Sequence, residues 1–494
     1  MSRIPDERPL NPKPEVVDGL RRLLPRESVL TTEAELAPYE CDGLSAFQQR
    51  PLVVALPETV EQVQAVMRLC HEMEVPVVAR GAGTGLSGGA LPLADGVLLS
   101  LAKFNRILGI DPANRSATVQ PGVRNLAISE AAAGHGLYYA PDPSSQIACS
   151  IGGNVAENSG GVHCLKYGLT VHNILKLKLI SVEGELFEVG ADALDSPGLD
   201  LLALMTGSEG MLAVIVEVTV KLLPKPERAQ ALLAAFDSVE QAGAAVAEII
   251  GAGIIPAGLE MMDRPAIRAA EDFVHAGYPT DVEAILICEL DGFNAEVSFD
   301  VMRVRDLLLA SGAADVRTAA DDAERLRFWK GRKAAFPAVG RISPDYYCMD
   351  GTIPRRQLGP VLRQISALSE QYGLAVANVF HAGDGNLHPL ILYDANNPGE
   401  LEQAEALGGA ILELCVEVGG TVTGEHGVGV EKLNQMCVQF NSAELNQMHA
   451  VKAAFDPKRL LNPGKAVPTL HRCAEFGAMH VHHGELKFPE LPRF

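Results

Sequence analysis

Apolar positions early in the chain fall into short continuous runs separated by one helical repeat. The runs 52–56 and 75–79 are typical of buried strands. Between them, apolar side chains recur at helical spacing after Thr59, which together with Gln62 has the sequence of a capping box. We therefore predict strand, helix and strand over 51–80, a parallel unit that opens a ligand crevice where it ends.

Shorter apolar segments continue to residue 223. We predict strands near 97–100 and 117–120. The segment 201–223 is typical of a short buried stretch, a turn at 207–210 and an alternating strand. Because Pro-Lys-Pro-Glu-Arg at 224–228 breaks the pattern, we place a domain boundary there.

The remaining chain has a pattern of its own. From about 229 to 440, Ala-rich helical stretches alternate with strands, which indicates an α+β domain. The strands predicted here are 284–290, 375–380 and 390–393. Residues 441–494 begin with a helical segment to Phe455 and end in a Pro- and His-containing tail. A length of 494 residues fits two or three domains, and we expect the divisions 1–228, 229–440 and 441–494.

Two glycine-rich loops lie in the first part. One follows the second strand as Arg-Gly-Ala-Gly-Thr-Gly-Leu-Ser-Gly-Gly at 80–89, and the other is Cys-Ser-Ile-Gly-Gly-Asn-Val-Ala-Glu-Asn-Ser-Gly-Gly at 149–161. Glycine lets backbone N–H groups approach a phosphate closely. One such loop is explained equally well as a tight turn, but two together favour a nucleotide diphosphate. A Rossmann arrangement is disfavoured because Pro92 and Gly96 interrupt the helix that would have to follow the first loop.

A second set of chemical residues lies in the later half. His381 and His388 are seven positions apart around Ala-Gly-Asp-Gly-Asn-Leu, and Gly-Glu-His-Gly follows at 424–427. A lone histidine beside such a turn usually caps it, but this set could supply two nitrogens and a carboxylate to a metal, plus a spare base. Zinc, manganese and ferrous iron all suit these ligands.

Two further segments contain residues that could bind a ligand. The segment 329–333, Trp-Lys-Gly-Arg-Lys, contains Arg332, whose planar fork could grip a carboxylate, although its spacing alone predicts a solvated helix face. His480, His482 and His483 lack an acidic or glycine framework, so we expect ordinary tail residues there.

Composition narrows the possible partners. The net charge is −21, and the acidic residues are not gathered into a tail, so we expect no nucleic acid partner. The N-terminus lacks the apolar core of a secretory signal, and the apolar run 243–259 is Gly-rich and interrupted by Pro256. Any membrane contact is therefore expected through a partner.

The cysteines favour a reducing setting. There are nine, an odd number, and none has Cys-x-x-Cys spacing. We predict reduced thiols in the cytoplasm and no self-contained iron–sulfur cluster.

These motifs resemble those of the flavoproteins related to vanillyl-alcohol oxidase, in the branch of D-lactate and D-2-hydroxyglutarate dehydrogenases. The resemblance spans nearly the whole chain and extends to the FAD-binding subunits of bacterial glycolate oxidases, through 39–45 and the ending at 471–483. It implies an α+β fold: a PCMH-type FAD-binding domain of two α+β subdomains over 1–228, and an α+β substrate or cap domain over 229–440 that carries the metal site. The segment 441–494 would pack back on the FAD domain.

The same resemblance implies FAD between the two subdomains. Since 80–90 contains no histidine, we expect the flavin to be held without a covalent bond. The residues implied to bind it are Arg80, Gly81, Ala82, Gly83, Thr84, Gly85, Ser87, Gly88, Pro141, Asp142, Ser145, Gly152, Gly153, Asn154, Asn158, Ser159, Gly160, Gly207, Glu209, Gly210, Ile215 and Asn462.

The resemblance also implies oxidation of a 2-hydroxy acid by hydride transfer to flavin N5. His381, His388 and Glu425 would bind the divalent metal. His426 would accept the hydroxyl proton, and Arg332 would bind the carboxylate. The positions expected around the far end of the substrate are apolar or nearly so, which favours glycolate or D-lactate over a longer diacid: Phe336, Cys348 and Leu390.

Reduced flavin needs an electron acceptor, and the sequence has neither a nicotinamide fingerprint nor a cluster motif. The resemblance implies a second flavin-type subunit and an iron–sulfur subunit of a glycolate oxidase complex, peripheral at the inner membrane through those partners. We therefore expect a dehydrogenase and not a peroxide-forming oxidase. Three alternatives stay open: a D-lactate dehydrogenase acting alone, a metal-assisted hydrolase, and a non-catalytic subunit that holds cofactor for a partner.

Overall fold

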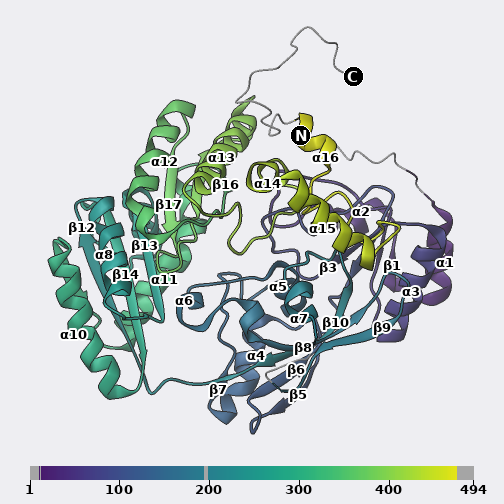
Figure 1. The fold of residues 1–494 in the computed structure, drawn as a ribbon, viewed down its shortest axis with the longest axis horizontal. Coiled ribbons are helices and arrows are strands. Elements are labelled where there is room, and N and C mark those ends of the chain that lie inside the picture. The colour runs from purple at the N-terminus through teal and green to yellow at the C-terminus, as the bar shows by residue number, and fades with distance from the viewer. Residues whose placement is uncertain (1–10, 12, 194–197, 476–494) are drawn as a thin grey trace.

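The computed structural model describes residue 11 and residues 13–193 and 198–475 (Figure 1). Its N-terminal half contains a four-stranded sheet in the order β1-β2-β4-β3, in which β2, β4 and β3 are parallel and β1 is antiparallel. The strands are β1 (Val29–Leu30), β2 (Val53–Ala55), β3 (Val77–Arg80) and β4 (Val97–Ser100). Helices α1 (Glu15–Leu23) and α3 (Val60–Met73) share an apolar core with this sheet, and α2 (Glu33–Leu36) follows β1.

The predicted strand, helix and strand are present as β2, α3 and β3. Thr59 caps α3, since its side chain accepts a hydrogen bond from the Gln62 backbone N–H at 3.3 Å. Gln62 returns its own bond to the Glu58 N–H at 2.7 Å instead of that of Thr59, so the reciprocal capping box is incomplete. No helix follows β3 before β4, as expected for a non-Rossmann loop.

A second, antiparallel sheet has the order β5-β6-β10-β8-β9. Its strands are β5 (Ile107–Asp111), β6 (Ser116–Val119), β8 (Ile174–Ile180), β9 (Leu186–Gly190) and β10 (Val214–Lys221). We expected β10 to alternate between buried and exposed positions, but it is buried nearly throughout. The reason is that Val214 and Val216 pack into the core of the first sheet, while Val218 and Val220 pack into that of the second.

Short elements complete the N-terminal half. They are α4 (Asn125–Ala132), α5 (Ile151–Glu157), α6 (Cys164–Tyr167), α7 (Leu201–Met205) and the strand pair β7 (Leu137–Tyr138) with β11 (Leu223–Pro224). Of these, α5 contacts β10 and carries the second glycine-rich segment.

A seven-stranded antiparallel sheet forms the left part of the molecule in Figure 1. Its order is β15-β12-β14-β13-β17-β18-β16. The strands are β12 (Arg228–Phe236), β13 (Gly258–Asp263), β14 (Ala284–Gly292), β15 (Asp315–Thr318), β16 (Asp345–Cys348), β17 (Val376–Phe380) and β18 (Pro389–Tyr393). The three strands predicted in this region are β14, β17 and β18.

Helices cover both faces of this sheet. One face packs against α8 (Val239–Gly251), α10 (Asn294–Ala310), α12 (Leu358–Tyr372) and α13 (Glu400–Glu417). The other packs against α9 (Arg264–Val274) and α11 (Asp322–Ala338). Both cores are continuous, so the sheet is a rigid support for the residues at the ends of β17 and β18.

The last helices are α14 (Leu433–Gln439), α15 (Ser442–Phe455) and α16 (Leu470–Glu475). Beyond α15 the chain returns to the N-terminal half, where Leu461 bridges to Val77 beside β3. Asn462 donates to the backbone oxygens of Gly89 at 3.0 Å and Glu209 at 2.7 Å. This segment therefore contacts both the first glycine-rich loop and the turn that precedes β10.

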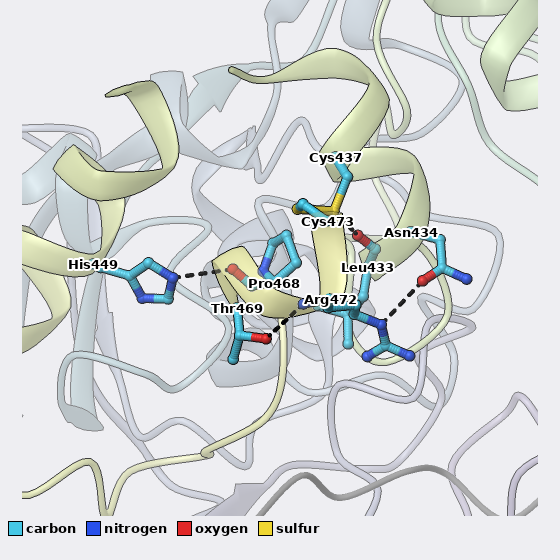
Figure 2. Close-up of a disulfide and its surroundings, with 8 residues drawn as sticks. All are labelled: Leu433, Asn434, Cys437, His449, Pro468, Thr469, Arg472 and Cys473. Carbon is cyan, nitrogen blue, oxygen red and sulfur yellow. Dashed lines mark hydrogen bonds between the residues drawn. A yellow bond between two sulfur atoms is a disulfide. The ribbon is translucent and has the colours of Figure 1, made fainter. Parts of the chain in front are cut away.

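A disulfide corrects the expectation of reduced thiols. Cys437 of α14 and Cys473 of α16 are joined, with their Cα atoms 5.2 Å apart (Figure 2). The two are 36 residues apart in sequence, and nothing in their spacing indicates that the returning chain brings them together. The other seven cysteines are free thiols. Cysteine usage is thus weaker evidence for a reducing compartment than the spacing suggested.

Within residues 13–193 and 198–475, none of the helices combines the length and apolarity required to cross a bilayer. His480, His482 and His483, for which ordinary tail residues were expected, lie outside the described residues, as does most of the ending 471–483.

A buried ionic cluster joins the two halves near α6. The His163 imidazole lies 3.0 Å from Asp142 through Nδ1 and 3.5 Å from Glu289 of β14 through Nε2. Glu289 also accepts from Trp329 at 2.5 Å and Arg325 at 3.0 Å, both on α11. Burial alone would lower the pKa of His163, but the two carboxylates raise it to about 10. The imidazole is therefore a cation over the physiological range.

We expect this cluster to make stability pH-dependent. Because the pKa of His163 is about 10 in the folded protein against 6.5 for the free side chain, its contribution is complete below pH 6.5 and is lost as the pH rises through 10. The excess in thermal midpoint of the wild type over His163→Gln should accordingly shrink between pH 6.5 and pH 10. The exposed His135→Gln is the control, and an excess of equal size at both pH values would contradict the assignment.

Candidate functional site

One cavity of about 380 Å³ lies where the two halves meet. Its walls come from both glycine-rich segments and β10 on one side, and from α11, the start of β18 and the 424–427 turn on the other. The structure thus brings the glycine-rich segments together with His388, Glu425 and His426 in one chamber, while His381 lies behind its wall in contact with Glu425.

Most of the residues expected to bind the cofactor line this cavity. They are Arg80, Gly81, Ala82, Gly83, Thr84, Gly85, Ser145, Gly152, Gly153, Asn154, Ser159, Glu209, Gly210 and Ile215. Arg80, at the end of β3, donates to the backbone oxygen of Cys41 at 2.8 Å and lies over the Tyr39 ring. The segment 39–45 therefore packs against the first loop and helps to hold its shape.

Eight of the expected cofactor residues do not line the cavity: Ser87, Gly88, Pro141, Asp142, Asn158, Gly160, Gly207 and Asn462. Three of them make contacts that hold neighbouring segments in place, and the cofactor role of all eight stays a prediction. Asp142 pairs with His163, as described above, and the Asn158 side chain accepts the Val171 N–H at 2.9 Å after the C-terminus of α5. Ser87 accepts the N–H groups of Val430 and Glu431 through its backbone oxygen, which ties the first loop to the segment after the 424–427 turn.

Gly160 has a particular position. A Cβ built there would lie 2.6 Å from Oε2 of Glu425. The residue thus belongs to the contact between the second glycine-rich segment and the carboxylate of the later half, and only glycine allows that approach.

The cavity wall fits a polar cofactor. Asn154 Nδ2 and Asp42 Oδ2 are buried and have no hydrogen-bond partner among the described residues, although both residues line the cavity. Gly81 lies so close to Ser150, the N-cap of α5, that a Cβ would meet its Oγ at 2.1 Å. Unpaired polar atoms beside glycine-lined backbone are the surroundings that a nucleotide cofactor requires.

The histidine and carboxylate side chains form a compact cluster. His381 directly follows β17 and His388 directly precedes β18, so the turn between these strands sets their separation. Glu425 Oε1 lies 3.3 Å from His381 Nε2 and 3.1 Å from His388 Nε2. One ligand atom from each residue falls within a group no wider than 4.8 Å. This donor set fits a divalent transition metal.

Burial controls the charges of these groups. It lowers the pKa of His388 to about 4, so this imidazole is neutral and available as a ligand. Burial alone would raise the pKa of the Glu425 carboxyl group. Hydrogen bonds from His381 and His388 outweigh burial and hold this pKa well below its ordinary value. A neutral imidazole beside a carboxylate anion suits a cation at this point.

Glu260 of β13 lies behind the cluster and was missed in the sequence. Its Oε1 is 2.7 Å from His381 Nδ1, which leaves Nε2 of that imidazole directed at Glu425. A carboxylate behind a histidine ligand is a common arrangement at metal sites, where it fixes the ring. No local pattern distinguishes Glu260 from the other residues of its buried strand.

Arg332 differs from the expectation. Its side chain is 1% exposed, Nε donates to Glu260 Oε2 at 2.8 Å, and Nη2 lies 2.7 Å from the same oxygen. The guanidinium neutralises Glu260, and Arg332 is absent from the cavity lining, whereas its neighbour Lys333 is part of it. The two neighbours differ because successive residues of α11 point in different directions. Carboxylate binding by Arg332 stays a prediction.

Of the three apolar positions expected near the far end of the substrate, Phe336 lines the cavity, with its ring edge toward His388 at a centroid distance of 6.0 Å. Cys348 and Leu390 are buried neighbours on β16 and β18 and do not line it. Other lining residues missed in the sequence include Asp42, Pro121, Cys149, Ser150, Glu157 and Lys333. Asp42 lies in the 39–45 segment, whose polar character was the available signal.

His426 completes the cluster. Its ring stacks on that of His388 at 5.0 Å and 17°, and Nε2 lies 4.0 Å from Glu425 Oε1. Burial lowers the pKa of His426. The imidazole therefore lines the cavity in its neutral form, able to accept a proton.

The sequence matches two family models. Residues 51–190 match the FAD binding domain, and residues 225–466 match the C-terminal domain of FAD linked oxidases. The glycolate oxidase subunit GlcD of Escherichia coli K12 is 70% identical over 97% of this chain and 96% of its own length. The GlcD subunit of Bacillus subtilis is 39% identical over 86% of this chain and 91% of its own length. A D-lactate dehydrogenase of Anaerostipes hadrus is 32% identical over 92% of this chain and 97% of its own length.

Solved structures agree in fold. A p-cresol methylhydroxylase with bound substrate has a TM-score of 0.79 at 19% identity, covering 92% of this chain and 97% of its own. The 4-ethylphenol oxidase of Gulosibacter chungangensis has a TM-score of 0.79 at 18% identity, covering 95% and 100%. At such identities the likeness shows the expected α+β fold of this flavoprotein class. The chain therefore belongs to the FAD-linked oxidases with a vanillyl-alcohol-oxidase-type fold, in the group that contains the glycolate oxidase GlcD subunits.

Proposed function

We propose that this protein oxidises a short 2-hydroxy acid, with glycolate favoured and D-lactate as the alternative. The supporting observation is the single cavity, which is lined by the FAD-type glycine loops and by His388, Glu425 and His426. The relatives named glycolate oxidase subunit and D-lactate dehydrogenase support this substrate class. A metal-assisted hydrolase would not need the glycine-lined half of the chamber.

The division of labour follows the halves of the chain. Residues 1–228 hold FAD without a covalent bond, 229–440 provide the metal ligands and the base, and 441–494 return to the first glycine loop through Asn462. When bound, flavin supplies a hydride acceptor, and a divalent metal on His381, His388 and Glu425 supplies a Lewis acid. Zinc, manganese and ferrous iron remain the candidates.

His426 takes the hydroxyl proton. A base must be unprotonated at the start, and burial lowers the pKa of this imidazole. It must also lie beside the oxygen that it deprotonates, and the distance of 4.0 Å between Nε2 and Glu425 Oε1 places it next to the proposed metal.

Two residues of α11 define the space for the rest of the substrate. Lys333 is an exposed residue at the rim of the cavity that it lines, and it makes no ion pair with any residue in the described ranges. We therefore assign its ammonium to the α-carboxylate. Phe336 provides an apolar wall beside His388, which suits hydrogen or methyl at the α-carbon better than a second carboxylate.

The electrons of the reduced flavin pass to partner subunits. The relatives named as glycolate oxidase subunits indicate a multi-subunit complex. We propose a second flavin-type subunit and an iron–sulfur subunit as the acceptors, with the chain in the cytoplasm and any contact with the inner membrane made through them. The protein would then be a dehydrogenase that reduces oxygen poorly.

Anaerobic titration tests the reaction. Glycolate or D-lactate should bleach the visible absorbance of the bound flavin, whereas 2-hydroxyglutarate should bleach it poorly. His426→Ala should keep its flavin but reduce it about 10²- to 10⁴-fold more slowly, because the base is gone. His135→Ala, an exposed histidine, is the matched control. Wild-type protein that no short 2-hydroxy acid bleaches would reject the proposal.

The contact at Gly160 tests the metal. Gly160→Ala places a Cβ against the Glu425 carboxylate and should weaken affinity for zinc or manganese about ten-fold or more, with flavin retained. Competition titration with a chelator and flavin absorbance are the measurements. Gly134→Ala, whose Cβ would meet nothing within 4 Å, is the control. Unchanged affinity in Gly160→Ala would place the metal elsewhere.

Steady-state kinetics test Lys333. Lys333→Met keeps the aliphatic stem, removes one charged hydrogen bond and should raise KM about 10- to 100-fold. Lys330→Met, exposed on the same helix, should leave KM unchanged. An unchanged KM in Lys333→Met together with a raised KM in Arg332→Met would return the carboxylate to the arginine.

A further inference from the structure

The turn that carries Glu425 and His426 is folded around one buried carboxylate. Asp350, two residues beyond β16, accepts the N–H groups of Gly424 at 3.0 Å, Glu425 at 2.8 Å and His426 at 2.7 Å, all on Oδ2. Its side chain is 0% exposed. Three successive backbone N–H groups that point at one oxygen form a binding site for an anion. In this protein the anion is the carboxylate of Asp350.

A buried lysine holds the other side of the turn. Lys432 pairs with Asp350 Oδ1 and also donates to the Gly427 backbone oxygen at 2.9 Å. Its side chain is likewise 0% exposed. The Thr423 hydroxyl lies 3.1 Å from both oxygens of Asp350 and from the Gly427 oxygen. Asp350 thus binds the Thr423 hydroxyl and the N–H groups of 424–426 at the start of the turn, and Lys432 binds the Gly427 carbonyl at its end.

We propose that Asp350, with Lys432, is a positioning residue that sets the Glu425 carboxylate and the His426 imidazole relative to each other. Asp350 does not line the cavity, whereas Glu425 and His426 do, so it acts through the backbone of these two residues and through the His426 ring, whose Nδ1 lies 3.9 Å from Oδ1. The inference rests on the roles of Glu425 and His426 given under the proposed function.

The alternative is that the Asp350–Lys432 pair only stabilises the fold. A buried ion pair that loses one partner leaves the other charge uncompensated, so either single change is destabilising for that reason alone. The two roles separate when both charges and the side-chain acceptor are removed together. The N–H groups of Glu425 and His426 then lack their acceptor, although that of Gly424 keeps the Asp350 backbone oxygen at 2.8 Å.

The experiment compares Asp350→Asn with the double variant Asp350→Leu/Lys432→Met, which has neither charge nor acceptor, using apo protein prepared with a chelator. In Asp350→Asn, the new amide group must point its NH2 either at the N–H groups of the turn or at the Lys432 ammonium. In both cases a hydrogen-bond donor then faces another donor. We expect amide exchange of residues 424–426 to rise about ten-fold or more, and zinc or manganese affinity to fall about ten-fold or more. Bound flavin should be unchanged.

The double variant should be more stable than Asp350→Asn, because no buried charge is left uncompensated, but it should recover neither the slow exchange nor the metal affinity. Recovery of all three would overturn the proposal, since the pair would then be merely structural, and so would wild-type exchange in Asp350→Asn. If Asp350→Asn does not fold, Thr423→Val replaces it and should raise exchange at the same amides. The exchange measurement needs no turnover or metal, so a failure of the proposed function leaves it readable.

Discussion

The central constraint of the structure is that the short segment 424–429 must serve both halves of the molecule at once. Asp350 binds the N–H groups at its start, and Glu209, from the turn before β10, accepts those of Val428 at 2.8 Å and Gly429 at 2.7 Å. An unsatisfied buried N–H group costs about 1–3 kcal/mol, so each carboxylate stabilises its part of the segment strongly. Because one comes from the later half and the other from the earlier half, the residues between them are fixed at the boundary.

Holding a turn with buried carboxylates requires compensating charge nearby, and the chain provides it from the same neighbourhood. Lys432 lies against Asp350, and Lys465 donates to the backbone oxygen of Gly89 beside Glu209 and Glu157. Burial raises the pKa of Glu157 well above its ordinary value, and the nearby Glu209 adds to this rise. The neutral form of Glu157 is thereby favoured. Burial also lowers the pKa of Lys465 to about 7, so both groups carry less charge here than they would in water.

The sequence predicted the parts of this site that local pattern determines. The strand, helix and strand over 51–80 follow from hydrophobic spacing, and His381 and His388 could be placed at strand ends because apolar runs flank their turn. Glycine-rich loops were recognisable without knowing which of their members face the cavity. Asp142 shows the limit, since its loop was identified correctly while its side chain pairs with a histidine at the boundary between halves.

What could not be predicted depends on distant segments meeting. Glu260, Arg332 and His381 form one chain of contacts across residues more than a hundred positions apart, and no local spacing encodes it. The same holds for Cys437 and Cys473, which only the return of the last helices brings together. The spacing of the basic residues at 329–333 predicted a solvated helix face for Arg332, whereas its guanidinium is buried against Glu260 of β13. The carboxylate role that the resemblance implied for Arg332 stays a prediction.

Because the chain as a whole is acidic, the attraction of an anionic substrate depends on the few cations that line the cavity. A protein of net charge −21 repels an anionic acid at long range, yet salt screens such repulsion beyond about 8 Å at physiological ionic strength. Inside the chamber the neutral imidazoles of His388 and His426 contribute no attraction, and Arg332 is neutralised by Glu260. Under the proposed function, the attraction on a 2-hydroxy acid would fall to Lys333 and to a cation held at Glu425, since Arg80 lies at the first glycine-rich loop. The carboxylate and hydroxyl oxygens would then meet different positive charges, and an acid bound in reverse would leave its carboxylate away from the lysine.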